Sequence, residues 1–335
     1  MKNYELYVGI DISKLKLDVS FIIDPTRKEQ DHLIVSNNSK GLTQLLKAIE
    51  KRHAQTAEVL VCFENTGVYG MPLALFLSKK KIDYSMVAAL EIKRSKGISR
   101  GKSDKADARD IALYAVTHRH NISLYQLPEA DILKLQLLHN QREKLMKAIL
   151  SLSMTNENNG FLPKEIVKEV QGVNNSAVRK LRELLQEIEK RMMELIKANE
   201  RIKQQYELAT SVPGVGQQIA IAMILATKSF TAFEKWRQLA CYAGIAPFEY
   251  SSGSSIRGRS KVNQMADKKL KALLNMAALT AKRCDKEIAD YYKRKVGEGK
   301  NAMSVLNAIR CKVVARVFAT ISRGTPYVNT QKFAN

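Results

Sequence analysis

The chain has 335 residues, 45% of them hydrophobic, which is enough to bury a core in each of roughly two or three domains. Its 55 Lys and Arg against 33 Asp and Glu give a formal net charge of +22, which favours nucleic acid over a membrane surface as partner. No apolar run is long enough to span a membrane, and the N-terminus lacks the apolar core of a signal peptide. The four cysteines are scattered without a CxxC pair, so we expect a reduced, cytoplasmic protein without a zinc site.

The N-terminal third predicts strands alternating with helices. LYVGID and KLKLDVSFII alternate apolar and other residues, which is typical of two antiparallel strands with a turn near Ser13. EVLVCFE is a short continuous apolar run, as in a buried central strand. A further strand is expected in DYSMVAA, and helices are expected at residues 37–52, 71–81 and 103–118.

Four acidic residues stand out by position. Asp11 follows the first strand and Glu64 ends the buried one, while Asp104 and Asp107 share a face at the start of a helix. Strand ends and helix starts of an open α/β sheet converge on one edge, where ligands bind. Singly, each acid also fits a turn, a strand end or a helix dipole. Together, in a basic protein, they predict a site for two Mg²⁺ ions that clamp a scissile phosphate. The remaining acids of this region are expected in turns or at the surface: Asp18, Asp24, Asp83 and Asp110.

The middle of the chain predicts a coiled-coil module. From Val178 to Tyr206 apolar residues recur at alternating spacings of three and four, and Asn199 takes one core position, where a buried Asn can fix register. An earlier helix carries a similar apolar stripe, and TNENNGFLP separates the two. The residues favour equally a helical hairpin within one subunit and a coil between subunits.

The C-terminal third, residues 206–335, has 21 basic and 8 acidic residues, net +13. SVPGVG between two helices predicts a helix-hairpin-helix-like phosphate site, or else a plain turn. The basic, Ser- and Gly-rich segment GIAPFEYSSGSSIRGRSKVNQ is typical of a flexible linker or phosphate clamp, and a nucleophilic serine in it would need a base from elsewhere. Trp236 is expected to anchor the core rather than to serve as a platform on which bases stack.

Two sets of motifs resemble a known family. GIDISKLKLDVSF, FENTGVYG and KSDKADARDIA resemble the RuvC-like DEDD domain of the bridge-RNA-guided transposases of insertion-sequence family one-hundred-ten. LACYAGIAPFEYSSG and RGRSKVNQ resemble the serine-bearing domain of the same family. The resemblance implies that the metal-binding acidic tetrad is Asp11, Glu64, Asp104 and Asp107. It places the nucleophile at Ser252, with Ser251 and Ser254 as alternatives.

The resemblance also implies the architecture, α/β plus α. A RuvC-like (RNase H-like) catalytic domain is expected at residues 1–127, a coiled-coil linker and oligomerisation domain at 128–205, and a mainly helical, serine-bearing transposase domain at 206–335. The coiled coil is then expected to join subunits.

The function implied is a DNA transposase that cleaves and rejoins target and donor DNA selected by a structured bridge RNA. The partners are DNA, this RNA and a second subunit, or four subunits in a synaptic complex, in the bacterial cytoplasm and without a membrane. Two alternatives stay open on the residues alone. One is a metal-dependent Holliday-junction-type nuclease in which the serine segment only clamps DNA. The other is a non-catalytic nucleic-acid-binding protein with structural acids.

Overall fold

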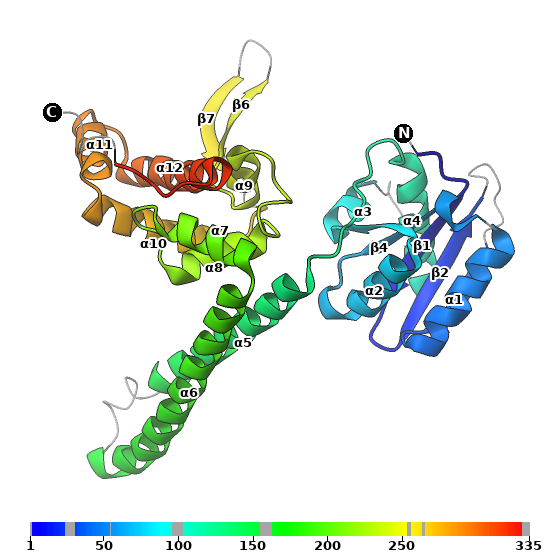
Figure 1. The fold of residues 1–335 in the computed structure, drawn as a ribbon, viewed down its shortest axis with the longest axis horizontal. Coiled ribbons are helices and arrows are strands. Elements are labelled where there is room, and N and C mark those ends of the chain that lie inside the picture. Colours follow the sequence, from blue (N-terminus) through cyan, green and yellow to red (C-terminus); the bar gives the residue numbers. More distant parts are fainter. Residues whose placement is uncertain are drawn as a thin grey trace. The chain divides into compact units, whose positions relative to one another are not determined.

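The computed structural model divides into two compact units, Met1–Leu127 and Pro128–Asn335, drawn in Figure 1. It describes residues 2–23, 31–53, 55–95, 103–154, 163–252, 256–262 and 265–329. The expected division after residue 205 falls within helix α7 (Glu200–Thr210) of the second unit, and the three-domain scheme stays a prediction. In the part of the chain so described, no helix is long and apolar enough to cross a membrane.

The first unit is built on a five-stranded mixed sheet in the order β3-β2-β1-β4-β5. Its strands are β1 (Leu6–Ile12), β2 (Lys16–Ile22), β3 (Asp31–Ser36), β4 (Val59–Glu64) and β5 (Asp83–Val87). β2 runs antiparallel to both β1 and β3, whereas β1, β4 and β5 are parallel. The predicted hairpin around Ser13 and the predicted buried strand are confirmed, and β3 is an addition at the edge.

Helices cover both faces of this sheet (Figure 1). α1 (Ser39–Arg52) and α2 (Met71–Lys80) bury leucines on one face, while α3 (Ala89–Ser95) and α4 (Asp104–Thr117) bury small and branched residues on the other. Two covered faces explain why EVLVCFE is continuously apolar. The predicted helices at 37–52, 71–81 and 103–118 are confirmed within a residue or two.

Gly9 in the middle of β1 lets α4 approach the sheet unusually closely. A Cβ atom added to Gly9 would lie 2.2 Å from the backbone nitrogen of Ala112 and 2.3 Å from the carbonyl oxygen of Ala108. Because no side chain could fit there, the glycine and the two alanines together set the distance between α4 and β1. The packing fixes the start of α4, with its two acids, relative to the sheet.

The second unit begins with a helical hairpin. α5 (Ala130–Met154) packs along α6 (Lys164–Ala198), and the two lie side by side in Figure 1. Leu135, Met192 and Ile196 are fully or almost fully buried, and Arg142 contacts Glu189 at 2.7 Å across the helix pair. The predicted seam therefore has a partner within the same chain, and a coil between subunits stays a prediction.

The structure corrects the expectation for Asn199. α6 ends at Ala198, so the seam does not continue as one helix to Tyr206. The Asn199 side chain instead caps α7, accepting a hydrogen bond from the Ile202 amide, and donates one to Asp131 Oδ2 at 3.0 Å. Asn is a strong N-cap because its short side chain satisfies an orphan amide of the first turn. That local bond, rather than a place in a coil, explains the residue.

The rest of the unit is a helical core that carries one β-hairpin. Its helices are α7, α8 (Gln217–Ala226), α9 (Trp236–Tyr242), α10 (Lys268–Cys284), α11 (Lys286–Gly297) and α12 (Ala302–Arg323). α12 buries Val305, Ile309, Val313 and Val317 along one stripe of this core. The turn between α7 and α8 packs against α10, because a Cβ on Gly214 would lie 2.4 Å from the Ala277 carbonyl. A phosphate site at this turn stays a prediction.

The expected flexible serine segment is in fact a β-hairpin. β6 (Pro247–Ser252) pairs antiparallel with β7 (Ile256–Val262), and the hairpin projects from the helices in Figure 1. Phe248 and Tyr250 in one run and Ile256 and Val262 in the other favour strands. The Gly and Ser content of this segment predicts a flexible loop, but its aromatic and branched residues favour the strands that are observed.

Candidate functional site

Asp11 and Glu64 stand at the carboxyl ends of two neighbouring parallel strands. Ile10 of β1 is in register with Phe63 of β4, and each acid is the next residue along its strand. Both side chains are half-buried. This is the sheet edge at which ligands bind in open α/β folds.

Asp104 and Asp107 lie in the first turn of α4, as the sequence predicted. Ser103 caps this helix, its hydroxyl accepting a hydrogen bond from the Ala106 amide at 3.2 Å. The helix N-terminus and its dipole favour negative charge in this turn. Since α4 packs on β1 and β2, its first turn carries both acids toward Asp11. Asp104 is exposed and Asp107 is half-buried.

The electrostatics at Asp11 report how these acids are grouped. Burial raises the pKa of Asp11 above its usual value, and the charges of Asp104, Asp107, Asp18 and Glu64 raise it further. The three other members of the predicted tetrad therefore all act electrostatically on Asp11. A half-buried acid surrounded by like charges is a site that favours a bound cation.

The carboxylates are gathered but not drawn to a common point. Among the described residues, three ligand atoms within 4.8 Å of one another occur only at Glu5, His53 and Glu58. Glu5 and Glu58 directly precede β1 and β4, at the strand ends opposite to the tetrad. His53 follows α1, and its Nε2 lies 2.8 Å from Glu58. Carboxylates repel one another at ligand distances unless a cation lies between them. Three of the tetrad side chains can therefore bind the same ion only if they rotate toward one another.

Two further residues of this edge were missed by the sequence reasoning. Lys16 Nζ lies 2.7 Å from Asp104 Oδ2 and 3.0 Å from Asp18 Oδ2, and these contacts raise the pKa of Lys16 to about 12, the Asp104 hydrogen bond contributing most. Asp18 was expected at the surface, but it is 3% exposed and faces Asp11 across the hairpin. Strand pairing buries it, and His32 Nε2 lies 3.2 Å from its other oxygen. The hairpin register around Ser13 was the signal that would have found Asp18.

The other acids set aside by the sequence reasoning have different places. Asp83 accepts hydrogen bonds from Lys2 and from the Tyr4 hydroxyl, at 2.6 and 2.8 Å, at the start of β5. Asp110 is half-buried on α4, and Asp24 lies outside the described residues.

Ser252 is the last residue of β6 and pairs with Ile256 of β7, next to the Ser251–Arg257 pair. Both serines therefore stand beside the tip of the hairpin, in the second unit. Ser254 lies outside the described residues. The acids are grouped within the first unit, and the serine assignment stays a prediction.

Family comparisons agree with this arrangement along most of the chain. A model described as Transposase, of the DEDD type of IS110 elements, matches residues 8–158. A second, described as Transposase IS116/IS110/IS902 family, matches residues 206–293. The chain belongs to the IS110 family of transposases. It is accordingly a DNA transposase or recombinase, and its DEDD domain belongs to a class that depends on divalent metal ions.

Relatives with curated names support the family. The chain is 26% identical to the pilin gene-inverting proteins of Moraxella bovis and Moraxella lacunata over 325 residues, which cover 96% of this chain and 97% of each relative. It is 31% identical over 118 residues to the insertion element IS110 uncharacterized 43.6 kDa protein of Streptomyces coelicolor, covering 35% of this chain and 29% of that protein.

Solved structures give a weaker likeness. The RuvC structure of Thermus thermophilus aligns with 36% of this chain and 99% of its own, at 10% identity and a TM-score of 0.27. The same enzyme in complex with a Holliday junction substrate aligns at 11% identity and the same TM-score.

Proposed function

We propose that this IS110 transposase is guided by a structured RNA and exchanges strands between target and donor DNA. In this proposal Asp11, Glu64, Asp104 and Asp107 hold Mg²⁺ and the scissile phosphate, and Ser252 is the nucleophile. The observation that supports the metal site is the placement of the four acids at one edge of the sheet, on the neighbouring strands β1 and β4 and in the first turn of α4. The raised pKa of Asp11, caused by burial and by the surrounding carboxylates, agrees with this grouping.

The donor set fits a hard divalent cation. All four side chains offer carboxylate oxygens, the ligands that Mg²⁺ prefers, and they come from β1, β4 and α4 at one sheet edge. When bound, two such ions would clamp the scissile phosphate and stabilise the charge that develops on it. The chain's own part is to hold the acids in place, which Gly9 does by setting the approach of α4, and Ser103 by capping it.

Lys16 takes part in this proposal as a mobile countercharge. Its ammonium group bridges Asp104 and Asp18, so it offsets repulsion within the acid group before a cation binds. A flexible lysine can leave Asp104 when a divalent ion takes its place. Asp18, which is buried, would then keep Lys16 near the edge and available to a DNA phosphate.

Ser252 would supply the covalent step. Its hydroxyl oxygen bonds to phosphorus as the bond from phosphorus to one sugar oxygen breaks. The serine proton passes to a base, and the released sugar oxygen takes up a proton. The phosphoserine link keeps the energy of the broken bond for rejoining, which a hydrolytic enzyme would lose. A position beside the tip of a projecting hairpin suits a side chain that must reach a DNA strand.

The nucleic-acid partners are proposed from charge and family. The net charge of +22, with +13 in residues 206–335, suits a protein that binds more than one polynucleotide. The guide RNA rests on resemblance to the family, as does assembly into dimers or tetramers.

The function is tested by recombination of labelled target and donor DNA with purified protein, in the presence and absence of the RNA transcribed beside the gene. We expect recombinant product only with the RNA and Mg²⁺, and none with Asp104→Asn. Asp110→Asn, a matched change on the same helix, should keep activity. Product formed equally well without RNA would contradict the guide, and full activity of Asp104→Asn would contradict the tetrad.

A further inference from the structure

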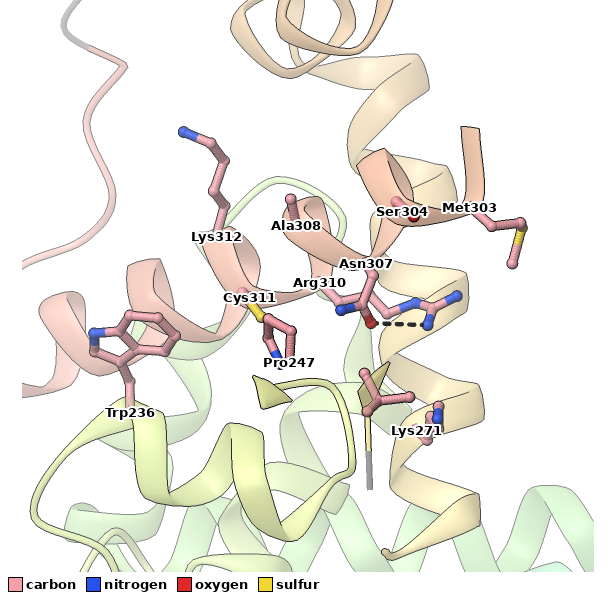
Figure 2. A pocket seen from close by; sticks show the side chains of 11 residues that line it. Trp236, Pro247, Lys271, Met303, Ser304, Asn307, Ala308, Arg310, Cys311 and Lys312 are labelled. Atoms are coloured by element: carbon pink, nitrogen blue, oxygen red, sulfur yellow. Dashed lines mark hydrogen bonds between the residues drawn. The ribbon is translucent and has the colours of Figure 1, made fainter. Parts of the chain in front are cut away.

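A large cleft lies at the base of the β6–β7 hairpin. It has a volume of about 1120 Å³, is open to solvent, and is bounded by the ends of the two strands, Pro247 and Val262, and by α9, α10 and α12. Figure 2 shows Trp236 at one side, Arg310 and Lys271 at the other, and Pro247 and Cys311 between them. Pockets for small molecules are usually smaller and more enclosed. The dimensions favour a segment of a polymer.

Arg310 is the unusual residue of this cleft. It is 6% exposed, and its guanidinium donates hydrogen bonds to Asn275 Oδ1 at 2.5 Å and to Asn307 Oδ1 at 3.2 Å. Both acceptors are neutral amides, and the buried Nε atom of Arg310 has no hydrogen-bond partner. None of the ion pairs among the described residues involves Arg310. Burial accordingly lowers its pKa. A buried cation held in place but not neutralised is favourable only if an anion joins it.

The other lining residues indicate which anion. Lys271 of α10 lies near Arg310 at the same side of the cleft, whereas the Lys312 side chain points away from them, with its ammonium 4.7 Å from the centre of the Tyr291 ring. Trp236 is half-buried, with its ring beside the cleft, and Met303 is 59% exposed. Cationic groups that follow a backbone, together with an aromatic surface for bases, are the two components of single-strand nucleic-acid sites.

We propose that this cleft binds an unpaired stretch of the DNA strand that is cut at Ser252, with a phosphate at Arg310 and Lys271 and a base against Trp236. The proposal rests on the proposed function for the choice of strand. Ser252 lies five positions beyond Pro247 along β6, about 17 Å at the rise of a strand. At about 3.4 Å per nucleotide, the stretch would lie no more than about five nucleotides from the cut. A cleft that holds it would keep a cleaved end from diffusing away.

The single tryptophan of the chain makes the site directly observable. The full-length protein, kept in EDTA so that no strand is cut, is titrated with a single-stranded DNA oligonucleotide. Trp236 fluorescence is recorded beside the anisotropy of a label on the DNA. We expect saturable quenching that follows binding, because a base stacks on the indole. An oligonucleotide with abasic sites should bind with little quenching.

Variants separate charge from stacking. Arg310→Met and Lys271→Gln should each weaken binding about tenfold and lower the dependence of log K on log salt by about 0.7. Lys286→Gln removes the same charge from an exposed position of α11 and is the matched control. It should change neither the quenching of Trp236 nor the affinity for DNA. Because Lys271 is half-exposed, we expect Lys271→Gln to fold. It therefore tests the proposal even if Arg310→Met fails to fold.

Three outcomes would overturn the proposal: saturating binding without a change in Trp236 fluorescence, equal effects of Lys271→Gln and Lys286→Gln, or stronger quenching by RNA of the same sequence than by DNA. Since no cleavage is involved, the measurement is independent of the catalytic proposal. The two proposals can fail separately. If DNA quenches Trp236 as expected but the Ser252→Ala variant still forms adducts, the cleft is supported and only the choice of nucleophile is wrong.

Discussion

Asp11 and Asp18 face each other across the β1–β2 pair, so that two carboxylates occupy opposite positions of one antiparallel ladder at the edge of the sheet. Like charges in that position are destabilising. The Lys16 ammonium offsets the charge of Asp18, whereas Asp11 has its pKa raised by burial and by the surrounding acids. The carboxylates around Asp11 therefore repel one another, and a bound cation would reduce this repulsion.

Asp11→Asn should stabilise the cation-free protein and remove its response to Mg²⁺. The raised pKa means that folding of the wild type loses stability as pH rises from the unfolded value of about 3.9 through the folded value. At pH 7 in EDTA the neutral variant should therefore melt higher. Mg²⁺ at a hundredfold its Kd should stabilise the wild type by about 2.7 kcal/mol and the variant far less. Equal shifts in both proteins, measured by thermal unfolding, would contradict a site at Asp11.

Gly9→Ala should destabilise the first unit by about 1 to 3 kcal/mol, because the new methyl group overlaps the backbone of α4. It should also weaken Mg²⁺ binding, since α4 carries Asp104 and Asp107. Gly70→Ala is the control, as a Cβ there would meet its nearest neighbour at 3.5 Å, an ordinary contact. Urea unfolding measures both, and equal stabilities of the two variants would contradict the close approach.

Asn199→Ala should destabilise the second unit by about 1 kcal/mol through loss of the α7 cap. The same side chain lowers the pKa of Asp131, chiefly by its hydrogen bond and with help from Lys134. A carboxyl with a lowered folded pKa adds stability above its unfolded value of about 3.9, and this is lost as pH falls through the folded value. The variant should lose part of that acid dependence. Urea midpoints between pH 2 and 5 measure it, and an unchanged profile would contradict the Asn199–Asp131 bond.

The oligomeric state depends on the exposed side of the helical hairpin. Val173 and Leu184 of α6 are 68% and 50% exposed, whereas Met192 packs inside the hairpin at 1%. If α6 also joins subunits, Leu184→Asp should give a smaller species in sedimentation with little change in melting temperature. Met192→Ala should lower the melting temperature and keep the mass. A mass unaffected by Leu184→Asp, alone or with Val173→Asp, would contradict a coil through this side.

The sequence predicted the elements whose pattern is local. The apolar run of β4 and the capped, alanine-lined α4 were sufficient to place Glu64, Asp104 and Asp107 at the right ends of their elements. β3 was missed because an edge strand that is largely exposed has no continuous apolar face. Asn199 was misassigned because a helix cap can fall in phase with a heptad pattern.

The sequence alone does not predict features that arise from strand pairing and helix packing. The burial of Asp18 depends on strand register, and the burial of Arg310 depends on the packing of α12 against α10, which brings Asn275 to its guanidinium. The Gly and Ser content of the serine segment predicts a flexible loop, whereas its few strand-forming residues are enough to form the β6–β7 hairpin.

The central claim, that acids holding a metal act with a serine nucleophile, is tested most directly by a denaturing gel of labelled target and donor DNA. Wild type, Ser251→Ala, Ser252→Ala and Ser254→Ala are compared with Mg²⁺ and guide RNA present. We predict a protein–DNA adduct that resists denaturation in every protein except Ser252→Ala, which should still bind DNA and Mg²⁺. Loss of the adduct only at Ser251 or Ser254 would contradict the choice of Ser252. Cleavage without an adduct in the wild type, or an adduct in all three variants, would contradict the serine mechanism itself.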